Sequence, residues 1–122
     1  MTTALAAHST ANNNMIELVI CNNDSMAEGA ISALNAAGYN KGGDTPTIPV
    51  FGVDATEAAK TLIKDKKMTG TVQQDAAGMA DALAQLTKNA QEEKDLMSGT
   101  EKLPVDENVR KIRIPYAKYL GQ

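Results

Sequence analysis

The chain has 122 residues and a mass of 12.9 kDa, the size of one domain. Its 12 basic and 15 acidic side chains give a net charge of -3, whereas nucleic-acid-binding domains are usually basic, so no nucleic-acid partner is expected. Cys21 and His8 are the only residues of their types, which excludes an intramolecular disulfide and a cysteine-rich metal site. We recognise no membrane span, and the N-terminus lacks the basic stretch of a signal peptide.

The first part of the sequence predicts a helix, a strand and a second helix. Residues 1–11 are rich in alanine and predict a helix. The short apolar, β-branched run 16–21 predicts a buried strand. Asp24 is expected to cap a helix over 25–37, whose apolar residues recur at helical spacing, and Gly38 is expected to end that helix.

The alternation of strand and helix continues in the second part. Further strands are predicted over residues 48–53, 70–73 and 109–114. A helix is predicted over 56–66, between the first two of these strands. Asp75 is expected to cap a long helix that runs to about residue 92, and a polar connection over 95–108 follows it.

This alternation is typical of an α/β fold, an open parallel sheet with flanking helices. In such sheets, ligands bind beyond the carboxyl ends of the strands. Amide and carboxylate groups follow three predicted strands there, at Asn22–Asp24, at Asp54 and at Gln73–Asp75. They suit hydrogen bonds to hydroxyl groups, whereas phosphate favours glycine-rich loops, Lys or Arg. The alternatives are that these residues are only helix caps, or that the acids form a metal or phosphoaspartyl site.

At these same residues the sequence resembles periplasmic galactose/glucose-binding proteins, within the ribose/galactose class that serves ABC transporters and chemotaxis. The matching stretches are V-I-C-N-N-D-S-M-A-E-G-A-I-S-A-L at 19–34, I-P-V-F-G-V-D-A-T at 48–56, G-T-V-Q-Q-D-A at 70–76 and V-R-K-I-R-I-P-Y at 109–116. The order and spacing of the stretches agree as well. The resemblance covers nearly all of this chain but only the C-terminal portion of the family's chain, so we expect a truncated form, either a fragment or an alternative-start product.

The resemblance implies part of a type I periplasmic-binding-protein-like fold, in which two α/β lobes close on one sugar. Residues 1–75 would form part of the C-terminal sugar-binding lobe. Residues 76–95 would form a helix that packs on the other lobe in the family, and residues 96–122 would form a connection, the closing strand and the tail. The first lobe and the aromatic rings that sandwich the sugar have no counterpart in this sequence.

Matched residue by residue, the family's sugar contacts in this lobe fall on Asn23, Asp54 and Gln74. The resemblance implies that Asn23 hydrogen-bonds ring hydroxyls and that Asp54 accepts from two hydroxyls as a carboxylate. Galactose/glucose binders commonly have asparagine where this chain has Gln74, and ribose binders can have glutamine there, so the identity of the sugar stays open. No catalytic residue is expected, and the chain is not expected to be an enzyme.

Glu17 matches a glutamate that completes a calcium site in some family members. Calcium takes 6–8 oxygen ligands, so Glu17 would bind it only in the full-length context. The alternative is an exposed charge at the start of a strand. No other cofactor is expected.

The implied function is monosaccharide binding by the extracytoplasmic component of an ABC sugar transporter, in the periplasm or at the cell surface. The transporter permease and a chemoreceptor would be partners of the full-length protein. Two alternatives stay open: the effector domain of a LacI-type regulator, which shares this fold, and a fragment that self-associates or complements a missing half without binding sugar. The last alternative rests on the apolar stripe Met79, Leu83, Leu86 and Ala90, which would lack intramolecular cover and favour a homo-oligomer.

Overall fold

The computed structural model describes residues 1–106, 108–109 and 111–121 of the chain. The chain forms two compact units. The first contains Met1–Gln73 together with Lys118–Gln122, and the second contains Gln74–Ala117. Among the described residues, no helix has the length and apolar character that a membrane crossing requires.

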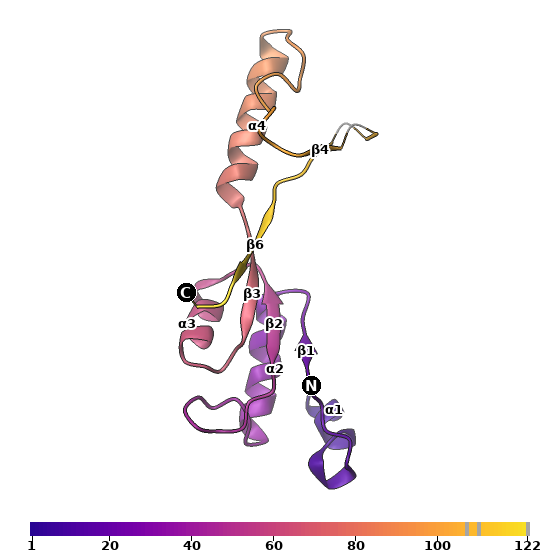
Figure 1. The fold of residues 1–122 in the computed structure, drawn as a ribbon, viewed down its shortest axis with the longest axis vertical. Helices are drawn as coiled ribbons and strands as arrows, with labels where there is room; N and C mark the ends of the chain where they lie inside the picture. Colours follow the sequence, from indigo (N-terminus) through magenta and orange to yellow (C-terminus); the bar gives the residue numbers. More distant parts are fainter. Residues whose placement is uncertain (107, 110, 122) are drawn as a thin grey trace. The chain divides into compact units, whose positions relative to one another are not determined.

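The first unit is built on a sheet with the strand order β1-β2-β3-β6 (Figure 1). The strands are β1 (Val19–Ile20), β2 (Val50–Val53), β3 (Gly70–Gln74) and β6 (Tyr116–Tyr119). β1, β2 and β3 run parallel, with Val19 opposite Val50 and Phe51 opposite Gly70. The predicted open parallel sheet is therefore confirmed.

The end of β6 lies beside the start of β3. A Cβ atom on Gly70, the first residue of β3, would lie 3.2 Å from the carbonyl oxygen of Tyr119, the last residue of β6. The two neighbouring strands therefore run in opposite directions. Lys60 adds a cation–π contact, because its Nζ lies 5.8 Å from the centre of the Tyr119 ring. The C-terminal residues are thereby held on the first unit.

Helices flank this sheet, as predicted. α2 (Asp24–Ala36) packs against β1 and β2, and α3 (Glu57–Lys64) packs against α2. α2 buries residues at the i, i+3, i+4 and i+7 spacing of one helix face. The buried core consists of Cys21, Ala27, Ala30, Ile31, Leu34, Ile48, Val50, Ala59, Ile63 and Met68. Before β1, α1 (Thr2–Ala7) and a 3₁₀ turn (Thr10–Asn12) replace the single helix predicted over 1–11, with His8 in an extended conformation between them.

The chain leaves α2 through a turn that depends on Gly38 and Asn40. Gly38 has a φ angle of 96°, the conformation that favours glycine after a helix, so its predicted role is confirmed. Asn40 is fully buried, and its Nδ2 donates to the carbonyl oxygens of Ile48 and Lys67 at 2.8 and 2.9 Å. Its Oδ1 accepts from the Ile48 N–H at 2.9 Å. One side chain thus joins the end of α2 to the segments that lead into β2 and β3.

The second unit contains a long helix and a short antiparallel ribbon. These are α4 (Ala76–Gln91), β4 (Val105–Asp106) and β5 (Lys111–Ile112). Asp75 caps α4 as predicted, because its Oδ1 accepts from the Gly78 N–H at 2.9 Å. Near the end of α4 the buried Asn89 donates to the carbonyl oxygens of Leu96 and Ser98 at 2.9 and 2.7 Å. That side chain holds the segment after α4 against the helix.

The first predicted strand is shorter and less buried than expected. Within the run 16–21 only Val19–Ile20 is a strand. Cys21 is buried, whereas Leu18 and Ile20 are 49% and 74% exposed. Because side chains alternate along a strand, β1 is covered on the face toward α2 and open on the other face. The prediction of a fully buried strand is therefore wrong.

The closing strand predicted over 109–114 also differs from the structure. Arg110 lies outside the described residues, and Lys111–Ile112 pairs with β4 instead of with the sheet. The strand that joins the sheet is β6, after Pro115. The alternation of basic and apolar residues favours a half-exposed strand but does not specify its neighbour, because register and partner depend on pairing between distant segments.

We expect the substitution Asn40→Ala to destabilise the first unit. It removes the hydrogen-bond partner of three backbone groups, the N–H and carbonyl of Ile48 and the carbonyl of Lys67. Leaving a buried backbone group unsatisfied costs about 1–3 kcal/mol. The free energy of unfolding, measured by urea denaturation, should fall by about 3 kcal/mol or more. Asn22→Ala is the control, since Asn22 is exposed; equal losses in the two variants would contradict this role of Asn40.

Candidate functional site

The carboxyl ends of the three parallel strands lie at one edge of the sheet, where ligands bind in folds of this class. Asp54 directly follows β2, and its backbone N–H donates to the carbonyl oxygen of Val72 in β3 at 2.8 Å. Asn23 follows β1 and precedes α2 at the same edge. The structure therefore brings the segments of these two predicted site residues to one edge of the first unit.

Asp54 and Ala55 form an unusual turn between β2 and α3. Their φ angles are 115° and 54°, which lie in the region that residues with side chains rarely adopt. Such a conformation persists only where the surrounding structure holds it. Ala55 is 8% exposed, whereas Asp54 is exposed. The turn thus keeps the Asp54 side chain accessible to solvent, while buried groups hold the backbone of the turn by hydrogen bonds.

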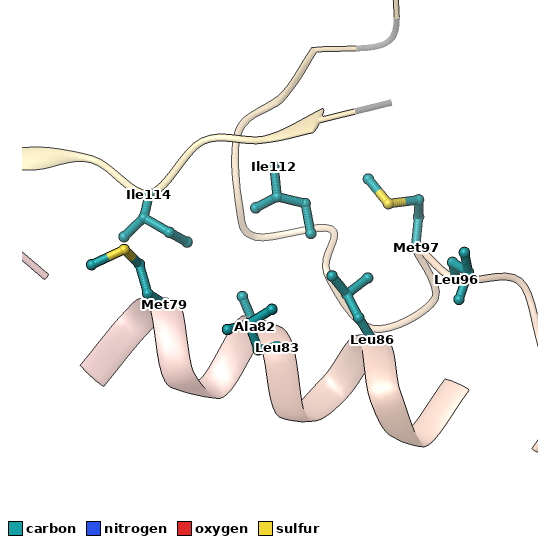
Figure 2. Close-up of a pocket in the computed structure, with 8 residues that line it drawn as sticks. All are labelled: Met79, Ala82, Leu83, Leu86, Leu96, Met97, Ile112 and Ile114. Atoms are coloured by element: carbon teal, nitrogen blue, oxygen red, sulfur yellow. The ribbon is translucent and has the colours of Figure 1, made fainter. Parts of the chain in front are cut away.

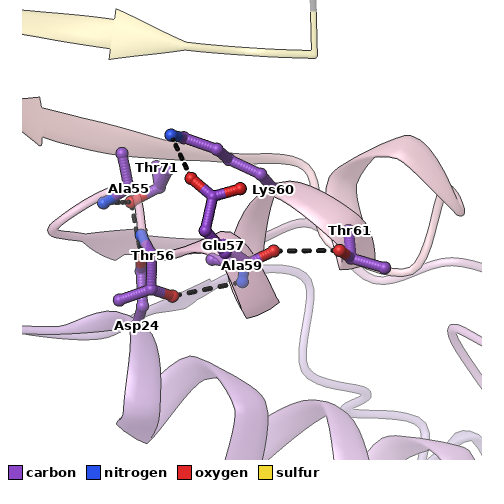
Figure 3. Close-up of polar contacts among 8 residues, drawn as sticks. All are labelled: Asp24, Ala55, Thr56, Glu57, Ala59, Lys60, Thr61 and Thr71. Atoms are coloured by element: carbon purple, nitrogen blue, oxygen red, sulfur yellow. Dashed lines mark hydrogen bonds and ion pairs between the residues drawn. The ribbon is translucent and has the colours of Figure 1, made fainter.

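The anchor is the carboxylate of Asp24, which is fully buried (Figure 3). Asp24 Oδ2 accepts from the backbone N–H of Thr56 at 2.8 Å, and Oδ1 accepts from the hydroxyl of Thr71 at 2.6 Å. The Thr71 oxygen in turn accepts from the Ala55 N–H at 3.3 Å. This network connects the start of α2, the turn after β2 and the second residue of β3.

The turn passes directly into a capped helix. Thr56 is the N-cap of α3, and its hydroxyl oxygen accepts from the Ala59 N–H at 3.2 Å. On the helix surface Lys60 Nζ donates to Glu57 Oε1 at 2.8 Å, a bond that raises the pKa of Lys60 (Figure 3). Both ends of the turn are therefore fixed, one by β2 and the other by the first turn of α3.

Gly52 provides the space for this buried carboxylate. A Cβ atom on Gly52 would overlap Asp24 Oδ1 and would lie 3.0 Å from the terminal carbon of Met68. Asp24 therefore occupies the position above β2 that a larger residue at 52 would fill. The glycine in the middle of the strand permits a close approach of the helix start to the sheet.

The cap of α2 lies one residue earlier than predicted. Asn23, and not Asp24, is the N-cap, because Asn23 Oδ1 accepts from the Met26 N–H at 2.8 Å. The prediction that Asp24 caps this helix is wrong, since Asp24 turns inward to Thr56 and Thr71. The Asn23 oxygen thus serves the helix, which leaves its amide nitrogen as the group suited to donate to a ligand.

Gln74 and Glu17 are the other residues that the sequence places in a site. Gln74 is half-buried, ends β3 and begins the second unit. Glu17 is exposed, just before β1. Within the described ranges, no group of three or more His, Cys, Asp or Glu side chains is arranged to hold a metal ion. The calcium site was expected only in the full-length context, so it stays a prediction.

Cys21 ends the first strand region and is 8% exposed. Burial raises the pKa of its thiol. A thiolate is the reactive form of cysteine, so a raised pKa and a buried position make Cys21 a packing residue of the core.

The second unit carries an apolar groove of about 530 Å³ (Figure 2). Its lining residues come from α4 and from the segments that follow it: Met79, Ala82, Leu83, Leu86, Leu96, Met97, Ile112 and Ile114. Ile112 and Ile114 face the helix across the groove (Figure 2). The α4 stripe is therefore covered in part by the unit's own residues, where the sequence predicted no cover, but Leu83 is still 64% exposed.

The groups at the sheet edge can accept from and donate to hydroxyls, through the carboxylate of Asp54 and the amide of Asn23. Sequence reasoning gave Asp24 a capping role and a place among the candidate polar groups at the sheet edge, but no buried structural role, and it gave Thr71 no role. One signal was available in the stretch G-T-V-Q-Q at 70–74. Because side chains alternate along a strand, Thr71 and Val72 point to opposite faces of the sheet. In the structure Thr71 lies opposite Gly52 and is buried, and a buried hydroxyl needs a hydrogen-bond partner.

Comparisons with known proteins support this reading of the fold. A family model described as a periplasmic binding protein domain matches residues 1–95. The D-galactose/methyl-galactoside binding periplasmic protein MglB of Haemophilus influenzae is 38% identical over 108 residues, which are 88% of this chain and 30% of that protein. This chain therefore spans less than a third of the length of that relative.

A solved structure shares both the fold and part of the sequence. It is the crystal structure of an ABC transporter solute-binding protein from Burkholderia multivorans, with an unknown ligand represented as α-D-erythrofuranose. The TM-score is 0.59 at 30% sequence identity, over 80% of this chain and 31% of that chain. With the family match over residues 1–95, the parallel sheet and its flanking helices show that this chain belongs to the periplasmic binding protein domain family.

Proposed function

We propose that this chain binds a monosaccharide of the galactose or glucose type, as part of the solute-binding component of an ABC sugar transporter. The observation that carries the proposal is the exposed carboxylate of Asp54, presented on a strained turn at the carboxyl edge of a parallel sheet. The amide of Asn23 is the second proposed contact, and Gln74 is the third. Binding without catalysis is proposed because both named relatives are binding proteins.

The names of the relatives support a setting for a longer protein of this family that would contain this chain. The MglB relative is named as periplasmic and galactose-binding, and the Burkholderia relative is named as an ABC transporter component. We therefore propose that the longer protein lies in the periplasm or at the cell surface, with the transporter permease as its partner; a chemoreceptor partner is proposed on the family resemblance alone. These names favour transport over the LacI-type regulator. A calcium site that includes Glu17 stays a prediction for that longer protein.

The substitution Asp54→Asn tests the proposed site. A carboxylate that accepts from two sugar hydroxyls contributes about 3 kcal/mol, on the order of a hundredfold in Kd. We expect galactose or glucose to shift the amide resonances of Asn23, Asp54 and Ala55 in a nuclear magnetic resonance (NMR) titration of the unmodified chain. Asp54→Asn should abolish these shifts, whereas the control Asp44→Asn, at another exposed aspartate, should retain them. An Asp54→Asn variant with an unchanged titration would contradict the proposal.

Gln74 is proposed to influence which sugar is preferred. Its side chain is one methylene longer than the asparagine that the resemblance places at this position in galactose/glucose binders. The change Gln74→Asn should therefore shift the ratio of the ribose and galactose Kd values toward galactose, by about tenfold. The neighbouring Gln73→Asn, which also shortens an amide side chain, is the control. A ratio that changes equally in both variants, or in neither, would remove Gln74 from the site.

Self-association is the second candidate function, and the groove of the second unit is the observation that favours it. Apolar side chains line this groove, and at its rim Leu83 is 64% and Leu96 is 46% exposed. Each large apolar side chain that becomes buried contributes about 1.5–3 kcal/mol. We propose a second copy of the chain as the occupant, because two such surfaces would bury the same stripe on each partner.

Light scattering of the purified chain over a range of concentrations tests this second function. We expect the average mass to rise with concentration, and Leu83→Asp should lower it toward that of the monomer because it places a charge in the apolar groove. Ala84→Asp adds the same charge at an exposed α4 position outside the groove and should leave association unchanged. A wild-type mass that stays at 12.9 kDa throughout would exclude self-association.

A further inference from the structure

We propose that Asp24 is a positioning residue that sets the geometry of the sugar site without touching the sugar. This inference rests on the proposed function, since Asn23 and Asp54 are the residues it would position. Asp24 is fully buried, so its carboxylate cannot reach a ligand at the sheet edge. Its effect on binding must pass through the groups that it contacts.

The contacts of Asp24 point to the strained turn. Both carboxylate oxygens are engaged, one by the Thr56 N–H at 2.8 Å and the other by the Thr71 hydroxyl at 2.6 Å. Because the Thr71 hydroxyl donates its proton to Asp24, its oxygen is oriented to accept from the Ala55 N–H. The two N–H groups that follow Asp54 are therefore both held by one buried charge, directly or through Thr71.

This arrangement explains how the turn can stay strained. The positive φ angles of Asp54 and Ala55 are unfavourable for residues with side chains, and relaxation would rotate the peptide groups on either side of Ala55. Such a rotation would remove the Ala55 and Thr56 N–H groups from their acceptors. Conversely, loss of the acceptors on Thr71 and Asp24 should let the strained turn relax and should move the Asp54 carboxylate.

The same carboxylate is tied to the other proposed contact. Asn23 immediately precedes Asp24 and is the N-cap of α2. Asp24 fixes the first turn of this helix against β3, through Thr71, and against the turn after β2, through Thr56. The relative placement of the Asn23 amide and the Asp54 carboxylate therefore depends on Asp24, which a binding site for a rigid sugar ring requires.

Substitutions of Thr71 test the proposal without removing the charge. Thr71→Val keeps the shape of the side chain but removes both the donor to Asp24 and the acceptor for Ala55. Thr71→Ser keeps the hydroxyl and should rescue the turn. Thr69→Val is the matched control, because Thr69 directly precedes β3 at the end away from the turn. Its Oγ1 accepts from the Val50 N–H at 3.2 Å. It removes one hydroxyl hydrogen bond from the same sheet without touching the turn.

Amide hydrogen exchange of the full 122-residue chain, followed by NMR, is the first measurement. In Thr71→Val the Ala55 and Thr56 amides should exchange at least about tenfold faster than in Thr69→Val, while the core amides of α2 keep equal rates in both. Equal rates at Ala55 and Thr56 in the two variants would overturn the proposal. If Thr71→Val does not fold, Asp24→Asn replaces it, because an amide of the same shape cannot accept from both donors.

Galactose titration of the same variants is the second measurement. We expect Thr71→Val to weaken galactose binding by about tenfold or more relative to Thr69→Val, and Thr71→Ser to bind as the wild type does. Faster exchange at the turn with unchanged galactose affinity would overturn the positioning role. A wild-type chain whose turn is protected but which binds neither galactose nor glucose would instead refute the proposed function, and the exchange data would still show what holds the turn.

Discussion

The buried carboxylate of Asp24 is the group that holds the carboxyl edge of this sheet together. Charges are rarely placed in a protein interior, because desolvation is costly unless each oxygen finds a donor. Here the donors come from two segments distant in sequence, the Thr56 N–H and the Thr71 hydroxyl. The requirement to satisfy one charge thus brings together the starts of α2 and α3 and the first part of β3. Gly52 leaves the space in which this occurs.

The strained backbone and the group that stabilises it belong to different residues: Asp54 has the unfavourable φ angle, and Asp24 stabilises the turn. Asp54 lies at the surface with a φ angle of 115°, and the hydrogen bonds that keep it there are made below it, among buried groups. The exposed side chain at position 54 can then vary in chemistry without loss of the buried hydrogen bonds. The fold of periplasmic binding proteins supplies the sheet edge, and the buried network determines where on that edge a side chain is presented.

Local signals in the sequence were enough for much of the fold. The cap at Asp75, the end of α2 at Gly38 and the parallel order of the strands all depend on short-range patterns and on the connection rules of α/β folds. The predictions were wrong where contacts with distant segments determine the orientation of a side chain or the neighbour of a strand. Asn23 and Asp24 are both good caps, and Asp24 turns inward because its hydrogen-bond donors, Thr56 and Thr71, lie 32 and 47 residues further on. The sequence suggested Asn23 and Asp54 through their positions after predicted strands and through the family resemblance, but it did not reveal the network beneath them.

The position of β6 has a consequence for the order in which the chain folds. β6 completes the sheet beside β3, yet more than 40 residues of the second unit separate the two strands in sequence. During synthesis β1, β2 and β3 emerge before the second unit, and the outer edge of β3 stays unpaired until β6 has left the ribosome. Closing this long loop has an entropic cost that the Lys60–Tyr119 contact helps to offset. The nascent chain therefore carries an open strand edge, at risk of wrong pairing, for as long as the second unit is being synthesised.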